Sequence, residues 1–439
     1  MDCAPVNSPS AGTYRPRKPR ASPLYQCAER HVGELRTEGR LKRLTEEKVI
    51  ARFLKCGDPH HGFARVYCPQ CRHDYLLAFS CKARYFCPSC HQKRVLAYGD
   101  WVEANVLAPV SHRQYVFTVP RILRSIFSRR RRLLGVLCQI IEGLMRENYA
   151  AVKPGCREGM ILFVQTFGDL VTFNPHVHVL AADGVFGDDG TFFVLPPVPH
   201  RMLERHFRTE VLAMLLHEGE ISETLVQRMG AWRHTGFSVH NGVRVCDAAG
   251  RQKLAQYMLR APFSLEKMCY DEHTGMVLYR SHLHKSLKRN YQLMPGAQWL
   301  ELLCQHIPDR FEQLVHYVGW YSNRVRGERA RHGAPAVRAD GDTPNDPTAD
   351  ALKARSTWAR LIYKVYEIDP LVCPRCNGPM KVIAVIDEPA VIRRILKHLH
   401  LWSPVARFKP ARGPPVAARD AVELAPQAEL SYHPIPDIA

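Results

Sequence analysis

Pairs of cysteines separated by two residues occur at three places in the sequence. Cys68 and Cys71 form the first pair, and Cys87 and Cys90 form the second, with fifteen residues between the pairs. Each pair can present two thiolates from one tight turn, and the spacing is typical of a tetrahedral four-cysteine zinc site. The sequence therefore predicts one zinc ion held by these four residues. Because four thiolates leave no open position for water, we expect this zinc to be structural.

Further potential metal ligands lie in the same stretch, namely Cys56, His60, His61, Cys81 and His91. They could bind a second metal or replace one ligand, but ordinary core cysteines and histidines explain them equally well. The third pair, Cys373 and Cys376, has no matching pair downstream. It is either half of a metal site, completed by His398 or His400, or a turn without metal.

Two histidines lie two residues apart in the segment Asn174-Pro-His-Val-His178. On a β-strand, His176 and His178 would leave the same face, while Val177 and Val179 would face the other way. Such a pair can hold one divalent cation, although two ordinary histidines give the same pattern.

The composition narrows the range of partners. The 439 residues include 61 Lys and Arg against 42 Asp and Glu, so the formal net charge is +19, which favours a polyanion such as nucleic acid or an anionic membrane surface. A hydrophobic fraction of 46% is that of a globular protein. We find neither an apolar stretch long enough for a membrane span nor a secretory signal, and therefore expect a cytoplasmic, nucleoid-associated protein. The sequence does not indicate its oligomeric state.

A polyanion partner and a two-histidine metal site together suggest phosphate chemistry, which needs a nucleophile. Tyrosine can serve by forming a covalent phosphotyrosine. Tyr257 lies on a predicted helix over 252–259, and Tyr317 and Tyr321 lie one turn apart on a predicted helix over 299–324. The spacing does not choose between them.

The segments that carry these residues predict a mixed α+β fold. Short apolar runs over 160–167, 177–182 and 192–195 read as strands of a buried sheet, whose edge the segments 270–280 and 282–291 could extend. Helical periodicity covers 24–54, 94–106, 121–149, 203–229, 351–366 and 390–401. The helix over 121–149 contains the run Arg129, Arg130, Arg131 and Arg132, which we expect to bind DNA.

The sequence resembles the insertion sequence 91 family of rolling-circle transposases, which are HUH (His-hydrophobic-His) endonucleases. The resemblance rests on Ser80-Cys-Lys-Ala-Arg-Tyr-Phe-Cys-Pro-Ser-Cys90, on Val164-Gln-Thr-Phe-Gly168 with the histidine pair, and on Tyr257-Met-Leu-Arg-Ala-Pro262. It implies an HUH domain with a central antiparallel sheet flanked by helices, preceded by a zinc-binding module. The family motif Tyr-x-x-Arg-x-Pro favours Tyr257 as the nucleophile. Lys253 occupies the position of a second tyrosine, which suggests the single-tyrosine branch.

The resemblance also implies a mechanism. His176 and His178, with Gln165 as a candidate third ligand, would hold Mg²⁺ or Mn²⁺, and Tyr257 would form a 5′-phosphotyrosine on single-stranded DNA. Asn174 stands where the family often has a third histidine. Arg260 is expected to bind phosphate or to pair with an acidic neighbour.

We expect six regions along the chain. They are a basic arm (1–23), a zinc-binding domain (24–110), the catalytic domain (111–326), a linker (327–350), a helical segment with the third cysteine pair (351–402) and a disordered tail (403–439). The expected function is DNA transposition by nicking and strand transfer. A replication initiator or relaxase with the same chemistry, and a zinc-dependent DNA-binding regulator without catalysis, are the alternatives.

Overall fold

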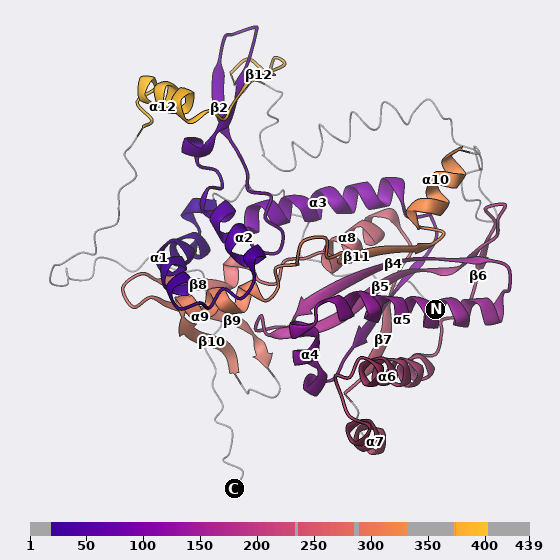
Figure 1. Cartoon of the computed structure of the whole chain (residues 1–439). Coiled ribbons are helices and arrows are strands. Elements are labelled where there is room, and N and C mark those ends of the chain that lie inside the picture. Colours follow the sequence, from indigo (N-terminus) through magenta and orange to yellow (C-terminus); the bar gives the residue numbers. More distant parts are fainter. Residues whose placement is uncertain (1–18, 233–235, 285–288, 332–372, 374, 403–439) are drawn as a thin grey trace.

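The fold is seen in a computed structural model, which describes residues 19–232, 236–284, 289–331, 373 and 375–402 (Figure 1). The arm up to residue 18, the linker from residue 332, the predicted helix over 351–366 and the tail from residue 403 lie outside the described residues.

A six-stranded antiparallel sheet forms the centre of the molecule. Its strands run in the order β11-β4-β5-β3-β7, and β6 pairs with β5. The bounds are β3 (His112–Thr118), β4 (Arg157–Phe167), β5 (Phe173–Phe186), β6 (Phe192–Val194), β7 (Ser238–Val245) and β11 (Val315–Gly319). The strands β4 and β5 are buried almost throughout, as expected from their nearly continuous apolar runs.

Helices cover both faces of this sheet (Figure 1). On one face, α5 (Arg132–Val152) and α6 (His200–His217) pack against the side of β5 that carries Val177 and Val179. On the other face, α3 (Pro88–Asn105) and α8 (Ala248–Met258) pack against Phe163 and Leu180. The predicted α+β fold, with an antiparallel sheet flanked by helices, is therefore confirmed.

A second sheet lies beside the first, with the strand order β10-β9-β8. Its strands are β8 (Met268–Asp271), β9 (Met276–His284) and β10 (Arg289–Pro295), and its core is shared with α1 (Pro23–Thr37), α2 (Leu44–Leu54) and α9 (Gly296–Cys304). The expectation that this region extends the central sheet is wrong. Its apolar face, which includes Val277 and Tyr279, packs against Trp299 of α9 instead.

The third sheet joins the two ends of the described chain. The hairpin β1 (Phe63–Tyr67) and β2 (Asp74–Ala78) receives β12 (Lys381–Ile386) as a third strand, in the order β12-β1-β2. The helix α12 (Pro389–His398) follows, and its Ile392 and Leu396 pack on Phe63. Figure 1 shows β12 and α12, in yellow, beside the indigo and purple N-terminal elements.

The helix predicted over 299–324 is wrong beyond Cys304. After Pro308 the chain forms β11, which contains Tyr317 and pairs with β4, and a turn places Tyr321 before α10 (Asn323–Arg331). The remaining elements are α4 (Arg124–Arg129), α7 (Glu223–Ala231) and the short 3-10 turns Pro19–Ala21, Pro59–His61, Arg121–Leu123 and Leu265–Lys267. None of the helices described is long and apolar enough to cross a membrane.

Candidate active site and metal centres

The two histidines lie side by side on the α8 face of β5. His176 is opposite Gln165 of β4, and His178 is opposite Phe163. The imidazole centroids are 4.9 Å apart. Both rings are buried, because α8 and the β4–β5 turn cover this end of the strands. Strand alternation thus presents two ring nitrogens from one face, as the sequence predicts.

Burial keeps both imidazoles neutral near pH 7. Removal from water lowers the pKa of His176 to about 4, and the same effect, added to by the neighbouring His176, lowers the pKa of His178 to about 3. The Nδ1–H of His176 donates to the carbonyl oxygen of Asn174 at 2.8 Å, so its Nε2 retains a lone pair. Neutral imidazole with a free Nε2 is the form that binds metal.

His178 also contacts a residue of β3. The amide nitrogen Nε2 of Gln114 lies 2.7 Å from Nδ1 of His178, and Nε2 of His178 is buried without a hydrogen-bond partner among the described residues. A buried polar atom without a partner is costly unless a ligand or ion satisfies it. When the Gln114 amide turns its oxygen to Nδ1, that oxygen accepts Nδ1–H, and the arrangement fits a cation at Nε2.

Gln165 carries a second buried polar atom that has no hydrogen-bond partner among the described residues. Its Nε2 donates to the carbonyl oxygen of Met258 at 2.6 Å, while its Oε1 has no partner among the described residues. The amide thus fixes the end of α8 with one atom and leaves an oxygen beside the histidine pair. Within the described part of the chain, no His, Cys, Asp or Glu completes a three-ligand group with His176 and His178.

Tyr257 lies near the end of α8 and faces the histidines. Its ring centroid is 6.0 Å from that of His178 in an edge-to-face arrangement, and the side chain is 45% exposed. The guanidinium carbon of Arg260 lies 4.5 Å from the Tyr257 ring centroid and 5.5 Å from that of Phe167. Among the described residues, no carboxylate lies within ion-pair distance of Arg260, so its charge stays available to an anion.

The other candidate tyrosines lie elsewhere. Tyr321 is fully buried, and its hydroxyl lies 2.7 Å from Nε2 of His112. Tyr317 donates its hydroxyl to that of Tyr98 at 3.1 Å. The geometry therefore brings Tyr257, and neither of these two, to the histidine pair.

An open cavity of about 820 Å³ adjoins His176. Its wall consists of α4, the β4–β5 turn and the residues after α8. The polar lining includes four arginines and one carboxylate, namely Arg121, Arg124, Arg129, Arg260 and Asp169, together with Ser125, Ser128, Thr172 and Asn174. Burial and the nearby charge of Arg121 lower the pKa of Arg124, which indicates a crowded positive potential. A cavity of this size and charge suits a nucleic-acid backbone.

The expectation that Arg129 to Arg132 act together on DNA needs correction. The helix breaks at Arg130, whose backbone leaves the helical region between α4 and α5, so the side chains diverge. Arg130 pairs with Glu220 at 2.8 Å, and Arg132 pairs with Glu218. Arg129 is exposed, reaches Glu220 only at 4.0 Å and lines the cavity.

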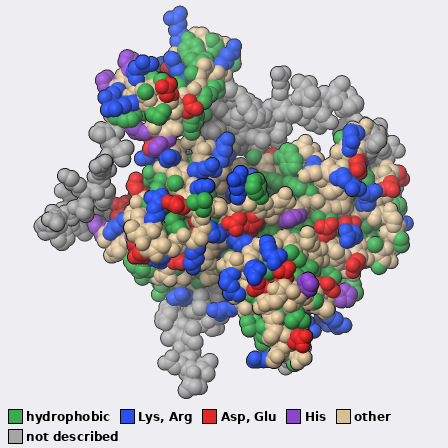
Figure 2. All heavy atoms as spheres, in the orientation of Figure 1, with side chains coloured by type: hydrophobic (Ala, Val, Ile, Leu, Met, Phe, Trp, Pro, Cys, Tyr) green, Lys and Arg blue, Asp and Glu red, His purple; other side chains and the backbone are tan. Residues whose placement is uncertain are grey.

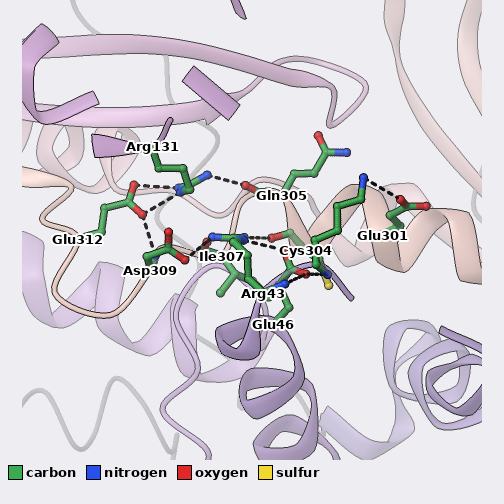
Figure 3. A network of polar contacts seen from close by, with 10 residues as sticks. Arg43, Glu46, Arg131, Glu301, Cys304, Gln305, Ile307, Asp309 and Glu312 are labelled. Carbon is green, nitrogen blue, oxygen red and sulfur yellow. Dashed lines mark hydrogen bonds and ion pairs between the residues drawn. The ribbon is translucent and has the colours of Figure 1, made fainter. Parts of the chain in front are cut away.

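Arg131 points into the protein and does not face solvent. It donates two hydrogen bonds of 2.9 Å to the carboxylate of Glu312 and one of 2.9 Å to the carbonyl oxygen of Gln305 (Figure 3). In the same network, Arg43 reaches Asp309 at 2.7 Å. A residue that is 7% exposed and paired in this way holds elements together and cannot contact DNA.

Positive charge is spread over the molecular surface. Figure 2 shows Lys and Arg side chains at many places on this face, with Asp and Glu among them. The net charge of +19 is therefore not concentrated in one arginine run on this face, and the cavity beside His176 is a more specific candidate for phosphate contacts.

The cysteines form two groups of four, and the predicted grouping is wrong. Cys56, Cys81, Cys87 and Cys90 form one group, here called the base cluster, and Cys68, Cys71, Cys373 and Cys376 form the other, called the tip cluster. In each group the four sulfur atoms lie within 4.8 Å of one another. None of the eight forms a disulfide bond.

The hairpin explains this division. Cys56 and Cys81 flank the base of the β1–β2 hairpin, where they meet Cys87 and Cys90, whereas Cys68 and Cys71 lie in its turn. Five-residue strands separate the two positions by roughly 16 Å, which is too far for one shared ion. Neither group includes a histidine. Nδ1 of His60 bonds to Asp58, and His91 bonds to the carbonyl oxygen of Leu259.

Comparison with known proteins assigns the two halves of the described chain. Residues 27–119 match the family described as "Transposase zinc-binding domain", and residues 159–329 match the family described as "Putative transposase". The chain is 30% identical over 369 residues to the "Putative transposase y4qJ" of Sinorhizobium fredii (strain NBRC 101917 / NGR234), which covers 78% of this chain and 90% of that protein. The chain belongs to the insertion sequence 91 family of transposases.

A further relative of this transposase is the "Transposase for insertion sequence element IS801" of Pseudomonas savastanoi pv. phaseolicola. It is 24% identical over 386 residues, which cover 80% of this chain and 86% of that protein. No solved structure gives a significant match. The zinc-binding domain and the DNA-acting transposase domain are thereby established, and the base cluster lies wholly within the matched zinc-binding region.

Sequence reasoning missed Gln114 and the structural role of His91. Gln114 carries no motif, because its role depends on the pairing of β3 with β5. His91 follows Cys90 and is a potential metal ligand by its position in the sequence, but its imidazole bonds to the end of α8. A pattern in the sequence cannot distinguish these contacts from ordinary burial.

Proposed function

We propose that this transposase moves its element by a rolling-circle reaction, in which Tyr257 nicks and transfers single-stranded DNA at the element ends through a 5′-phosphotyrosine. The observation that carries the proposal is the position of the Tyr257 ring, 6.0 Å from His178 and under the guanidinium of Arg260. The reaction would take place on DNA in the nucleoid of the cytoplasm.

The proposed metal ligands are His176 and His178 through Nε2, with Gln165 as the candidate third ligand through Oε1. The unpartnered Nε2 of His178 and Oε1 of Gln165 support this assignment, since a cation would satisfy both. The amide oxygen suits Mg²⁺ or Mn²⁺, and the two imidazoles favour Mn²⁺ of the two ions, with remaining positions for water and phosphate. When bound, the cation would polarise the scissile phosphate and stabilise the leaving oxygen.

The proposed step exchanges one oxygen–phosphorus bond for another. The Tyr257 oxygen forms a bond to phosphorus, and the bond between phosphorus and the 3′ oxygen of the preceding nucleotide breaks. The phenol loses its proton, and the 3′ oxygen gains one. One phosphodiester is exchanged for another, so neither ATP nor an oxidant is needed, and attack by a 3′-hydroxyl on the phosphotyrosine rejoins the strand.

Arg260 would support this reaction in two ways. Stacked on the Tyr257 ring, it restricts the orientation of the ring, and its free guanidinium can bind the phosphate that the tyrosine attacks. Arg124 and Arg129 would hold the neighbouring backbone phosphates within the cavity.

We assign the structural zinc of the matched domain to the base cluster. Three of its sulfur separations, of 3.6 to 3.9 Å, agree with the roughly 3.8 Å expected for a tetrahedron with zinc–sulfur bonds of about 2.3 Å. Backbone N–H groups of Cys81 and Cys90 point at the sulfurs of Cys56 and Cys87, which favours thiolates.

The experiment is an adduct assay on labelled single-stranded DNA from the element ends, with Mn²⁺ or Mg²⁺. Wild type should form a covalent complex that survives denaturation, and Tyr257→Phe should form none. Tyr317→Phe is the matched control and should react like wild type, because its hydroxyl bonds to Tyr98 away from the site. An undiminished adduct in Tyr257→Phe would contradict the assignment.

The same assay separates the alternatives. A relaxase or replication initiator would form the adduct on plasmid origin DNA and leave the DNA flanking the gene uncut. A regulator would bind DNA without any metal-dependent adduct.

A further inference from the structure

We propose that the tip cluster is a second zinc site, in which the cysteine turn of the β1–β2 hairpin and the cysteine turn before β12 share one ion. The site would close a zinc ribbon from two segments that are far apart in the sequence. Cys373 and Cys376 lie outside the matched zinc-binding domain, which ends at residue 119.

The two cysteine turns have the same backbone geometry. Cys68 N–H donates to the carbonyl oxygen of His73 at 2.8 Å, and Arg72 N–H donates to that of Cys68 at 3.0 Å. The second turn repeats both bonds at the same offsets, because Cys373 N–H donates to Gly378 at 2.8 Å and Asn377 N–H donates to Cys373 at 2.9 Å.

The left-handed residue also falls at the same place in each turn. Arg72 has φ 58° and Asn377 has φ 55°, each four residues after the first cysteine. Two unrelated turns have no reason to match in this way, whereas two zinc knuckles that face one ion do.

The sulfur positions complete the argument. Sγ of Cys68 is 3.5 Å from Sγ of Cys376, and Sγ of Cys71 is 3.4 Å from Sγ of Cys373. These separations are far longer than a disulfide bond of about 2.05 Å and close to those of a four-thiolate zinc site. Each knuckle contributes one buried and one exposed cysteine.

Packing alone is insufficient to hold this part of the chain. The apolar residues around the tip cluster are Val66 and Met380, with Tyr75 and Leu77 packed partly against them. So small a core requires a metal or a disulfide. Because β12 pairs with β1 directly beside the knuckles, the ion would fasten the C-terminal strand and α12 to the N-terminal module.

The first test is the zinc content of the full-length protein. Wild type should contain two zinc ions per chain, and Cys373→Ser with Cys376→Ser should contain one. Cys269→Ser, at an exposed cysteine of β8 outside both clusters, should keep two. The same zinc content in wild type and in the Cys373→Ser/Cys376→Ser protein would overturn the proposal.

The second test needs no substitution and thus cannot fail through misfolding. Cys71, Cys376 and Cys269 are all exposed, so an alkylating reagent should label all three if none binds metal. Of these three cysteines, we expect only Cys269 to be labelled in the native zinc-loaded protein, and Cys71 and Cys376 to be labelled after a chelator removes zinc. Equal labelling of the three before chelation refutes the site, and neither test depends on DNA cleavage.

Discussion

Nε2 of His91 lies 2.9 Å from the carbonyl oxygen of Leu259, two residues beyond Tyr257. The other ring nitrogen, Nδ1, accepts the backbone N–H of Tyr85 at 3.1 Å. Since Tyr85 and His91 lie on either side of Cys87 and Cys90, one imidazole connects the base cluster to the helix end that carries the proposed nucleophile. Burial lowers the pKa of His91 to about 4, so the imidazole is neutral and its Nε2–H donates.

We therefore expect His91→Ala to slow DNA nicking by about 10- to 100-fold, because small displacements of a reacting group have effects of this size. The rate constant should fall while the zinc content stays unchanged, which separates positioning from metal loss. His91→Gln retains an N–H donor and should recover part of the rate. His206→Ala, at an exposed position of α6, is the control. Wild-type rates in His91→Ala would show that the contact has no influence on Tyr257.

Gln114 should control the protonation of His178. An amide can present its oxygen or its nitrogen to Nδ1, and only the oxygen, which accepts Nδ1–H, leaves Nε2 free for a cation. Gln114→Leu is expected to weaken Mn²⁺ binding by about 10- to 100-fold, as for other residues that orient metal-binding histidines.

Gln114→Glu provides the matching test, because a carboxylate can only accept the Nδ1–H bond. Calorimetric titration with Mn²⁺ should show binding at least as tight as in wild type. If the Leu and Glu variants lose the same affinity, the hydrogen bond to His178 does not determine metal binding.

His112 should make the fold sensitive to acid. It is fully buried, and removal from water lowers its pKa from 6.5 to about 3. Between these values the unfolded chain binds more protons than the folded protein, so this residue's contribution to stability is complete above pH 6.5 and is lost as the pH falls. At pH 5 the loss is about 2 kcal/mol of unfolding free energy.

Urea unfolding at pH 7 and pH 5 measures this effect. His112→Asn should lose less free energy between the two pH values than wild type, because asparagine does not titrate. Contributions from the other buried histidines and from the thiolates are shared by both proteins and cancel in the comparison. The same loss in both proteins would exclude His112 as a source of acid sensitivity.

Arg131 and Arg129 are two residues apart, but we expect Arg131→Ala to lower the stability of the protein and Arg129→Ala to weaken DNA binding. Arg131→Ala leaves the carboxylate of Glu312 buried without its partner and is expected to cost about 3–5 kcal/mol of stability. Arg129→Ala removes only a 4.0 Å surface contact and should change stability by less than about 0.5 kcal/mol.

Binding of single-stranded DNA completes this comparison. Arg129→Ala should weaken binding and lower the salt dependence by about one phosphate contact, because Arg129 lines the cavity. A stable Arg131→Ala protein, or an Arg129→Ala protein with unchanged salt dependence, would disagree with the positions of these residues.

Local patterns in the sequence predict those features of the fold and the site that depend only on residues close together in the chain. The common face of His176 and His178 follows from strand alternation, and the helix that carries Tyr257 follows from its periodicity. The grouping of the cysteines was beyond such patterns, since the partners of Cys68 and Cys71 lie about 300 residues away. The burial of Arg131 likewise depends on Glu312, whose position is fixed only by the fold.

The strand β11 shows a second limit of prediction from the sequence. Its five residues are too few to distinguish a strand from a helix by periodicity, and its pairing with β4 decides the outcome. Tertiary contacts thus separate Tyr317 from Tyr257, although the sequence offers both as similar helical tyrosines.

The pairing of β12 with β1 determines when, during translation, this sheet can be completed. Cys71 and Cys373 are 302 residues apart, so at roughly 5–20 residues per second the ribosome needs about 15 to 60 s to make the second after the first. During that interval the edge of β1 that later receives β12 is unpaired. A polypeptide cut short after residue 331 contains both histidines and Tyr257 but not the last strand of this sheet. Completion of the hairpin sheet therefore requires a chain that has been translated at least as far as residue 386.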